Sequence, residues 1–155
     1  MKLSTSQDFD VPIGVLYGRI SDVDMLERLA LRRGIEVQHR ASTPRFAAGA
    51  VWDVRFHLRG RDRTLVTTLT GLEAPHSLRV EAVGTGLDAA LAVDLVALSR
   101  SRTRLALDFV IRPRSMPARL LVQTMKLSRR RLKQTLTDRL EGVARRIEND
   151  YRRAL

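Results

Sequence analysis

The amino-acid sequence predicts an α+β fold in which a curved antiparallel sheet of about seven strands packs against a long C-terminal helix. Three observations lead to this prediction. Most of residues 2–112 form short segments in which apolar and polar residues alternate, as in half-buried strands. Two short helical segments follow the first strand. Residues 115–151 have the periodicity of one long amphipathic helix.

The N-terminal part begins with a strand and continues into the two short helices. In segment 3–11 the odd-numbered residues share one face, and this face is the more apolar one. Pro12 suits the first turn of a helix, and the apolar spacing predicts helices over 13–20 and 23–33. Gly34 is a suitable residue for ending the second helix.

The middle of the chain reads as successive antiparallel strands. Turn-forming residues such as Thr43-Pro44 and Gly84-Thr85-Gly86 separate the segments. In the segment 87–98 both alternating sets of positions contain apolar residues. Asp94 belongs to one set, so we expect the other set, which includes Leu91 and Val93, to face inward. The six further strands span residues 35–40, 51–58, 63–72, 78–83, 87–98 and 102–112.

The C-terminal helix places its large apolar residues on one side. At about 100° per residue they fall within a sector of roughly 120°, as a helix packed on a sheet requires. A helix of this length cannot bury such a stripe alone, so we expect it to lie across the sheet and to enclose a cavity with it. The residues of the stripe are Ala118, Leu121, Val122, Met125, Leu132, Leu136, Leu140, Val143, Ile147 and Tyr151.

Composition narrows the class of protein. The chain has 155 residues, of which 44% are hydrophobic, so we expect a single domain over residues 1–155. No segment approaches the roughly 20 apolar residues of a membrane span, and residues 1–11 do not resemble a signal peptide. Cysteine is absent, which excludes disulfides and thiolate metal sites and fits a reducing compartment. We therefore expect a soluble, cytoplasmic protein.

The positive charge is concentrated at the C-terminal end. Residues 112–155 contain 13 Lys and Arg against 4 acidic residues, whereas residues 1–111 contain 15 against 13. Such an excess attracts anionic membrane surfaces or acidic partners through a field that salt screens. Alternatively, the charges only keep one helix face hydrated. Nucleic acid is a less favoured partner because no exposed aromatic platform for base stacking is evident.

The order of elements and two segments resemble those of the START-like (SRPBCC) superfamily, which includes polyketide cyclase/dehydrase-like and birch-pollen-allergen-like proteins. The segments are Asp8-Phe9-Asp10-Val11-Pro12 and Leu26-Glu27-Arg28-Leu29, the second leading to Arg33-Gly34-Ile35-Glu36-Val37. The resemblance implies a helix-grip fold with an apolar pocket for lipids, polyketides or other hydrophobic molecules. The glycine-rich loop of the allergen-like branch is missing, since the connection after the second strand reads Ala41 to Gly49.

Residues on the predicted inner faces are the candidates for ligand contact. Core packing alone also accounts for the aromatic ones among them. The candidates are Phe9, Tyr17, His39, Trp52, Val54, Phe56, Leu78, Val80, Leu107, Phe109, Leu121, Met125, Ser128, Arg129 and Leu132.

Arg129 is a cation in the middle of the apolar sector of the C-terminal helix. An ionised guanidinium is costly to bury without a partner, so it either meets the carboxylate or phosphate of an amphiphilic ligand, reaches solvent, or pairs with an acid. The histidines at 39, 57 and 76 lack metal-site spacing, and only His39 shares an apolar phase. We expect no catalytic residues, no metal and no cofactor.

These features favour a protein that binds or carries a small hydrophobic or amphiphilic molecule, because the inner face is apolar and has few titratable groups. An enzyme of the cyclase/dehydrase type is the alternative, and it would need an acid/base pair drawn from His39, Tyr17 and Arg129. A third possibility is an interaction protein that docks on anionic lipid or RNA through its basic helix.

Overall fold

The computed structural model describes all 155 residues and confirms the predicted fold class. Seven antiparallel strands form one open sheet in the order β1-β7-β6-β5-β4-β3-β2. The strands are β1 (Lys2–Phe9), β2 (Glu36–His39), β3 (Val51–Leu58), β4 (Arg61–Glu73), β5 (Ser77–Gly84), β6 (Leu87–Ser99) and β7 (Arg102–Pro113).

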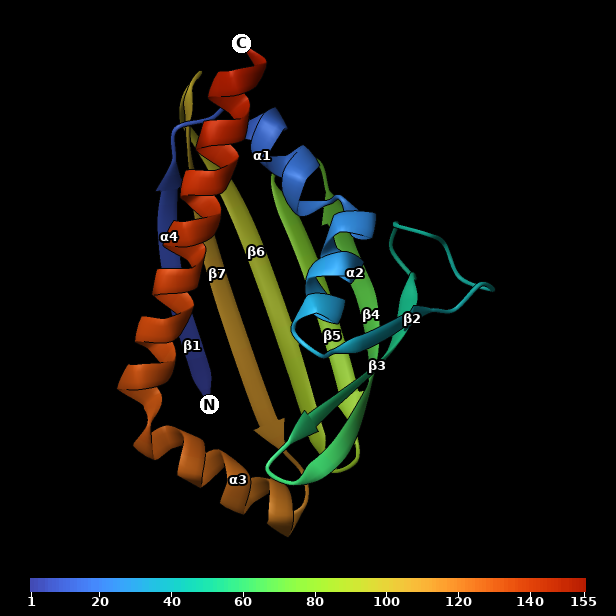
Figure 1. Ribbon diagram of the computed structural model, residues 1–155. Coiled ribbons are helices and arrows are strands. Elements are labelled where there is room, and N and C mark those ends of the chain that lie inside the picture. Colours follow the sequence, from blue (N-terminus) through green and yellow to red (C-terminus); the bar gives the residue numbers. More distant parts are fainter.

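Four helices accompany the sheet (Figure 1). The helices are α1 (Ile13–Ile20), α2 (Val23–Arg32), α3 (Met116–Leu127) and α4 (Arg129–Ala154). In Figure 1, α1, α2 and α4 lie in front of the curved sheet, with α4 running alongside β1, and α3 lies across one end of it. The sheet and these helices therefore enclose the interior of the molecule.

The helix ends follow from the local sequence. The side chain of Asp22 accepts a hydrogen bond from the Met25 amide at 3.2 Å and caps α2. Gly34 follows this helix with a φ of +76°, a conformation that other residues seldom adopt. Ser115 caps α3 in the same way as Asp22, by accepting from the Ala118 amide at 3.2 Å.

The prediction of one continuous helix over 115–151 is wrong in one respect, because the helix is broken at Ser128. The Ser128 amide donates to the Met125 carbonyl at 3.0 Å, and its backbone (φ −105°, ψ 18°) leaves the helical conformation. Serine is a weak helix former, and the break lets α3 and α4 each bury a separate apolar face. Periodicity missed it because both segments keep helical spacing.

The core cluster draws on β1, α1 and β4, whose residues Phe9, Leu16 and Leu69 are almost fully buried. Thr103 is the one buried polar residue, and its hydroxyl donates to the Val11 carbonyl at 2.9 Å. The chain after β1 is thereby held against β7.

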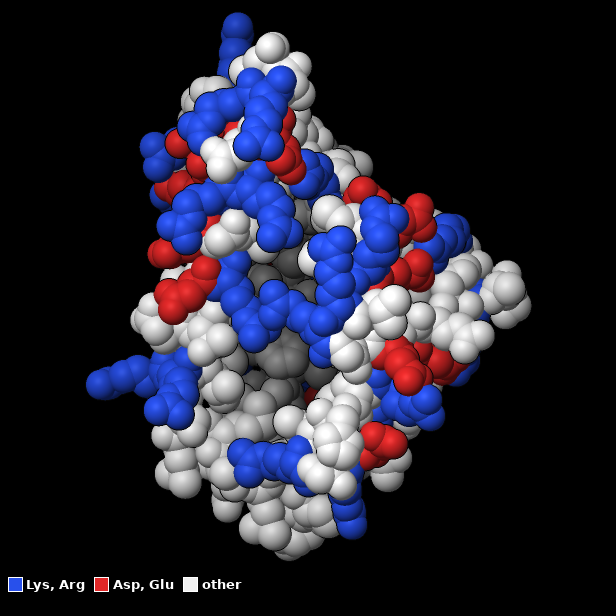
Figure 2. Space-filling model, viewed as in Figure 1, with Lys and Arg blue, Asp and Glu red and all other residues white.

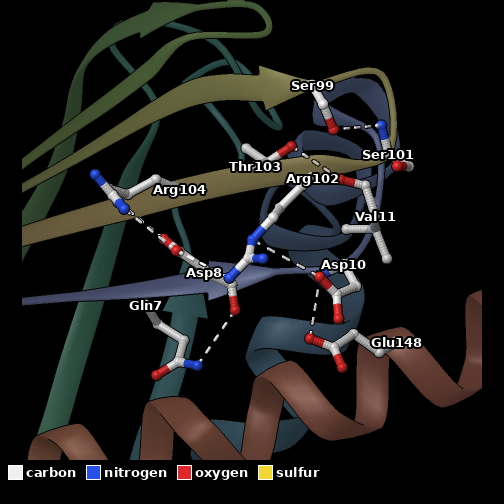
Figure 3. Close-up of polar contacts among 10 residues, drawn as sticks. All are labelled: Gln7, Asp8, Asp10, Val11, Ser99, Ser101, Arg102, Thr103, Arg104 and Glu148. Atoms are coloured by element: carbon white, nitrogen blue, oxygen red, sulfur yellow. Dashed lines mark hydrogen bonds and ion pairs between the residues drawn. The ribbon is translucent and has the colours of Figure 1, made fainter.

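Charged groups fasten α4 to the same end of the sheet (Figure 3). Arg104 donates to the carboxylate of Asp8 at 2.8 Å, and Arg102 donates to it at 3.3 Å. The Asp10 amide donates to Glu148 of α4 at 3.1 Å. These contacts join β1, β7 and α4.

Candidate functional site

A cavity of about 370 Å³ lies between the inner face of the sheet and the helices. Strands β2 to β7 provide its floor, and α1, α2 and α4 provide its rim. Fifteen of the 17 lining residues are hydrophobic. They are Ile20, Val23, Leu26, Glu27, Val37, Phe46, Trp52, Val54, Thr67, Leu69, Leu78, Val80, Leu91, Val93, Leu105, Leu107 and Leu140.

The lining follows from the two-residue period of the strands. Leu91 and Val93 lie on the inner face of β6, as the position of Asp94 predicts, and Val80 pairs with Leu91 across the sheet. Figure 2 shows the hollow between α4 and α2, with Lys and Arg side chains on both sides of it and uncharged surface inside. The interior is apolar while its surroundings are basic.

One wall of the cavity contains a charged cluster. The side chain of Glu27 on α2 accepts two hydrogen bonds from Arg45, at 2.6 and 2.9 Å, and one from the Trp52 indole at 3.1 Å. Arg45 also donates to Asp24 at 2.7 Å. The hydrogen bonds from Arg45 are the largest cause that lowers the pKa of Glu27 from its usual 4.5. They outweigh burial, which raises it.

The loop between β2 and β3 closes this wall. Its Phe46 lies edge-on to Trp52, with ring centroids 6.3 Å apart, and lines the cavity. The ion pairs of Arg45 with Asp24 and Glu27 tie the same loop to α2. The loop therefore covers the cavity with an aromatic ring and is fastened by charge.

Five of the residues predicted to contact a ligand line the cavity together: Trp52, Val54, Leu78, Val80 and Leu107.

The other predicted strand and helix α1 residues lie around the cavity and not in its wall. Phe9 and Tyr17 are buried in the adjoining core. Phe56 and Phe109 continue the inner faces of β3 and β7 beyond the lining and are half-buried. The His39 ring packs 5.5 Å from Trp52, and its Nε2 atom lies 2.7 Å from the Pro44 carbonyl.

The predicted residues near the helix break also lie outside the cavity. Leu121, Met125 and Leu132 are half-buried, and Ser128 and Arg129 are exposed. Arg129 is therefore not a buried cation: its guanidinium donates to the Lys2 carbonyl at 2.9 Å. The predicted apolar sector assumed one helix axis, and the break at Ser128 invalidates that assumption. The α4 residue that does line the cavity is Leu140.

The groups considered for acid/base chemistry are not paired with one another. Tyr17 donates to the Ser77 carbonyl at 3.4 Å, and Arg129 and His39 each contact a different backbone carbonyl. The only titratable side chain in the lining is Glu27, which the sequence-based selection missed. Its spacing from Val23 and Leu26 on one face of α2 is the signal that could have identified it.

A larger depression of about 870 Å³ lies at the edge of the sheet. It includes neighbouring residues from both faces of β3, Asp53, Val54 and Arg55, so it wraps around the edge and is open to solvent. The smaller cavity is the better candidate site because its wall is nearly continuous apolar surface.

Comparison with known proteins identifies the fold but no specific relative. No protein-family model matches the chain, and no curated protein matches it in sequence. Among solved structures, the Zhui aromatase/cyclase from Streptomyces sp. R1128 has a TM-score of 0.67 at 16% identity, covering 99% of this chain and 97% of that one.

Two further structures are similar over most of their length. The protein TTHA0849 from Thermus thermophilus has a TM-score of 0.67 at 12% identity, covering 95% of this chain and 97% of that one. A START superfamily protein from Mycobacterium smegmatis has a TM-score of 0.57 at 12% identity, covering 90% and 98%. The chain has the START-like, helix-grip fold.

Proposed function

We propose that this protein binds a small hydrophobic or amphiphilic molecule in the cavity between its sheet and its helices. The observation that carries the proposal is the lining itself, in which 15 of 17 residues are hydrophobic. Apolar walls that keep a few polar groups are the usual form of a small-molecule site. Glu27 and Thr67 are the polar groups in this wall.

The size of the cavity suits one guest of modest size. Small-molecule pockets usually measure about 300–1,000 Å³, and 370 Å³ lies near the lower end of this range. An apolar guest would replace poorly hydrogen-bonded water against the half-buried lining residues Val80, Leu91 and Leu107, which is favourable because apolar surface leaves water.

The replacement Leu91→Trp tests the proposal by filling the cavity from the floor. We expect the variant to remain folded, because the added ring enters empty space, and to lose binding of the neutral apolar probe N-phenyl-1-naphthylamine in calorimetric titration. In a filled core the same replacement would cost about 1–3 kcal/mol.

The matched control is Val96→Trp, which adds an indole to the same strand at a side chain that is 57% exposed. This control should bind the probe as the unmodified protein does. Equal binding by the Leu91→Trp variant would refute the proposal. Native mass spectrometry of protein purified from its own host would then report whether any small molecule co-purifies.

A cyclase/dehydrase-type enzyme is the second candidate, because one structure with this fold is an aromatase/cyclase. The lining offers it only Glu27 as a titratable group. Arg45 and Trp52 occupy both carboxylate oxygens, and the lowered pKa of Glu27 makes it a poor proton acceptor. Binding is therefore the better supported function.

A further inference from the structure

Helix α3 has two apolar faces. Ala118 and Val122 are buried against the rest of the protein. Met116, Leu120 and Leu127 are 64%, 59% and 90% exposed. At about 100° per residue these three fall within roughly 40° of one another, on the side opposite Ala118. The helix thus presents a second apolar stripe to solvent, which an ordinary surface helix does not do.

Cations without acidic neighbours lie beside this stripe. No Asp or Glu occurs between Asp108 and Asp138. Exposed cations that take part in no ion pair occur on α3 and on the first turns of α4. Arg129 among them donates to the Lys2 carbonyl, and those without a side-chain hydrogen bond are Arg119, Lys126, Arg130, Arg131 and Lys133. Lys126, Arg129 and Arg112 also help to lower the pKa of the Met1 amino group, after the larger effect of burial.

The break at Ser128 brings the stripe and the cations to one corner. Because α3 turns away from the axis of α4, its outer face forms the end of the molecule beside the first turn of α4 (Figure 1). Figure 2 shows this end as mainly uncharged surface with Lys and Arg side chains beside it. We call this surface, formed by Met116, Leu120, Leu127 and the five cations above, the α3 corner.

We propose that the α3 corner docks on an anionic lipid bilayer, with α3 lying in the plane of the interface. Met116, Leu120 and Leu127 would enter the boundary between headgroups and acyl chains, while the cations contact lipid phosphates. Amphipathic helices that bind membranes in this way combine an apolar face with a Lys- and Arg-rich one.

None of the four helices has both the length and the apolarity to cross a bilayer. A separate observation favours a lipid surface over nucleic acid. Residues 114–137 contain no Phe, Tyr or Trp, so the corner lacks the aromatic platforms on which nucleic-acid bases stack. None of the α3 residues lines the cavity, and docking therefore stands independently of the proposed ligand binding.

Co-sedimentation of the full chain with phosphatidylcholine vesicles, with and without phosphatidylglycerol, tests the proposal. We expect binding only to vesicles that contain the anionic lipid, and weaker binding as salt is added. The double variant Leu120→Ser/Leu127→Ser should reduce binding by about tenfold or more, because it removes the apolar contact. The control Leu31→Ser/Val96→Ser changes apolar side chains that are 68% and 57% exposed elsewhere and should leave binding unchanged.

A second pair of variants tests the charges. Arg130→Glu/Arg131→Glu should also reduce binding by about tenfold or more, whereas Arg145→Glu/Arg152→Glu makes the same charge change farther along α4 and should reduce binding less. Circular dichroism verifies that every variant is folded.

Three results would overturn the proposal. The first is the absence of binding to vesicles that contain phosphatidylglycerol. The second is binding that the charge variants weaken and the leucine variants do not, since the apolar stripe would then take no part in docking and the contact would be electrostatic alone. The third is a dimer of the unmodified protein that Leu120→Ser/Leu127→Ser dissociates, since the stripe would then be covered by a second copy of the chain.

Discussion

Glu27 joins the cavity wall to the loop that closes it. Its carboxylate accepts from Arg45 on the loop and from Trp52 on β3, and its own backbone belongs to α2. Charge-assisted hydrogen bonds of this kind are stronger than neutral ones, and the side chain of Glu27 is only 26% exposed. The contact should therefore contribute more to stability than an exposed ion pair.

Replacing Glu27 with Gln should lower the free energy of unfolding at pH 7 by about 1–2 kcal/mol. The amide keeps the shape of the side chain and an acceptor for Trp52, but it loses the charge that Arg45 contacts. Urea denaturation measures the difference. Glu36→Gln is the control, because the Glu36–Arg55 pair is 62% and 57% exposed and should contribute less than about 1 kcal/mol. Equal losses in the two variants would contradict this account.

Single positions were predictable from sequence where strand alternation determined them. Trp52, Val54, Leu78, Val80 and Leu107 were placed on inner faces by the period of two, and all five line the cavity. Arg129 was misplaced because its environment depends on the direction of a helix axis, which spacing does not report. The spacing of Glu27 on α2 indicated which face it lies on, but its contact with Arg45 was not predictable because Arg45 lies on a loop with no periodic pattern.

The sequence predicted the helix that forms α4 but assigned one of its residues to the wrong face. The stripe predicted for residues 115–151 included Val143, which is 43% exposed, and the neighbouring Ala144 is buried instead. Leu140 and Ile147 do face inward. Because the helix breaks at Ser128, the packing of α4 alone determines which of its faces meets β1. The Thr137 and Thr5 hydroxyls, 3.1 Å apart, mark that contact.

Truncating Leu140 and Val143 to Ala distinguishes these two faces. Leu140→Ala should lower the free energy of unfolding by about 2–4 kcal/mol, because it removes buried contacts and enlarges an existing cavity. Val143→Ala should cost less than about 1 kcal/mol, because this side chain is already in contact with water. Urea denaturation measures both values, and a larger loss for Val143→Ala would show that α4 is rotated relative to this description.

For the molecule as a whole, acid should be destabilising. Hydrogen bonds from Arg104, Arg45 and Arg40 are the largest causes that lower the pKa values of Asp8, Glu27 and Asp53, respectively. A carboxyl whose pKa is lower in the folded state stabilises the fold above its unfolded pKa. This contribution is lost as the pH falls through the folded value. Acid also removes negative charge from a chain that already has a net charge of +11.

We therefore expect the Tm to decline by several degrees or more between pH 6 and pH 3, mostly below the usual pKa values of 3.8 for Asp and 4.5 for Glu. Thermal unfolding followed by circular dichroism measures the effect. Added salt at pH 3 should restore part of the loss, because it screens the repulsion among cations but does not ionise the carboxyls again. A Tm that is constant over this range would contradict the assignment of these three carboxyls.

The architecture was predictable because each strand, turn and helix cap agrees with the same fold. Alternating residues, or a dense apolar run bounded by turn residues in the case of 87–98, predicted all seven strands, and Asp22 and Gly34 mark the limits of α2. What the sequence could not supply was the relative direction of α3 and α4, since that depends on how each helix packs.

The position of Trp52 has a practical consequence. It is the only tryptophan of the chain, and its ring forms part of the cavity wall while its indole nitrogen donates to Glu27. Its ultraviolet emission therefore arises from one place in the molecule, and any guest that displaces water there changes the polarity around the fluorophore. The protein thus carries an intrinsic optical reporter with which a library of compounds can be screened without a label.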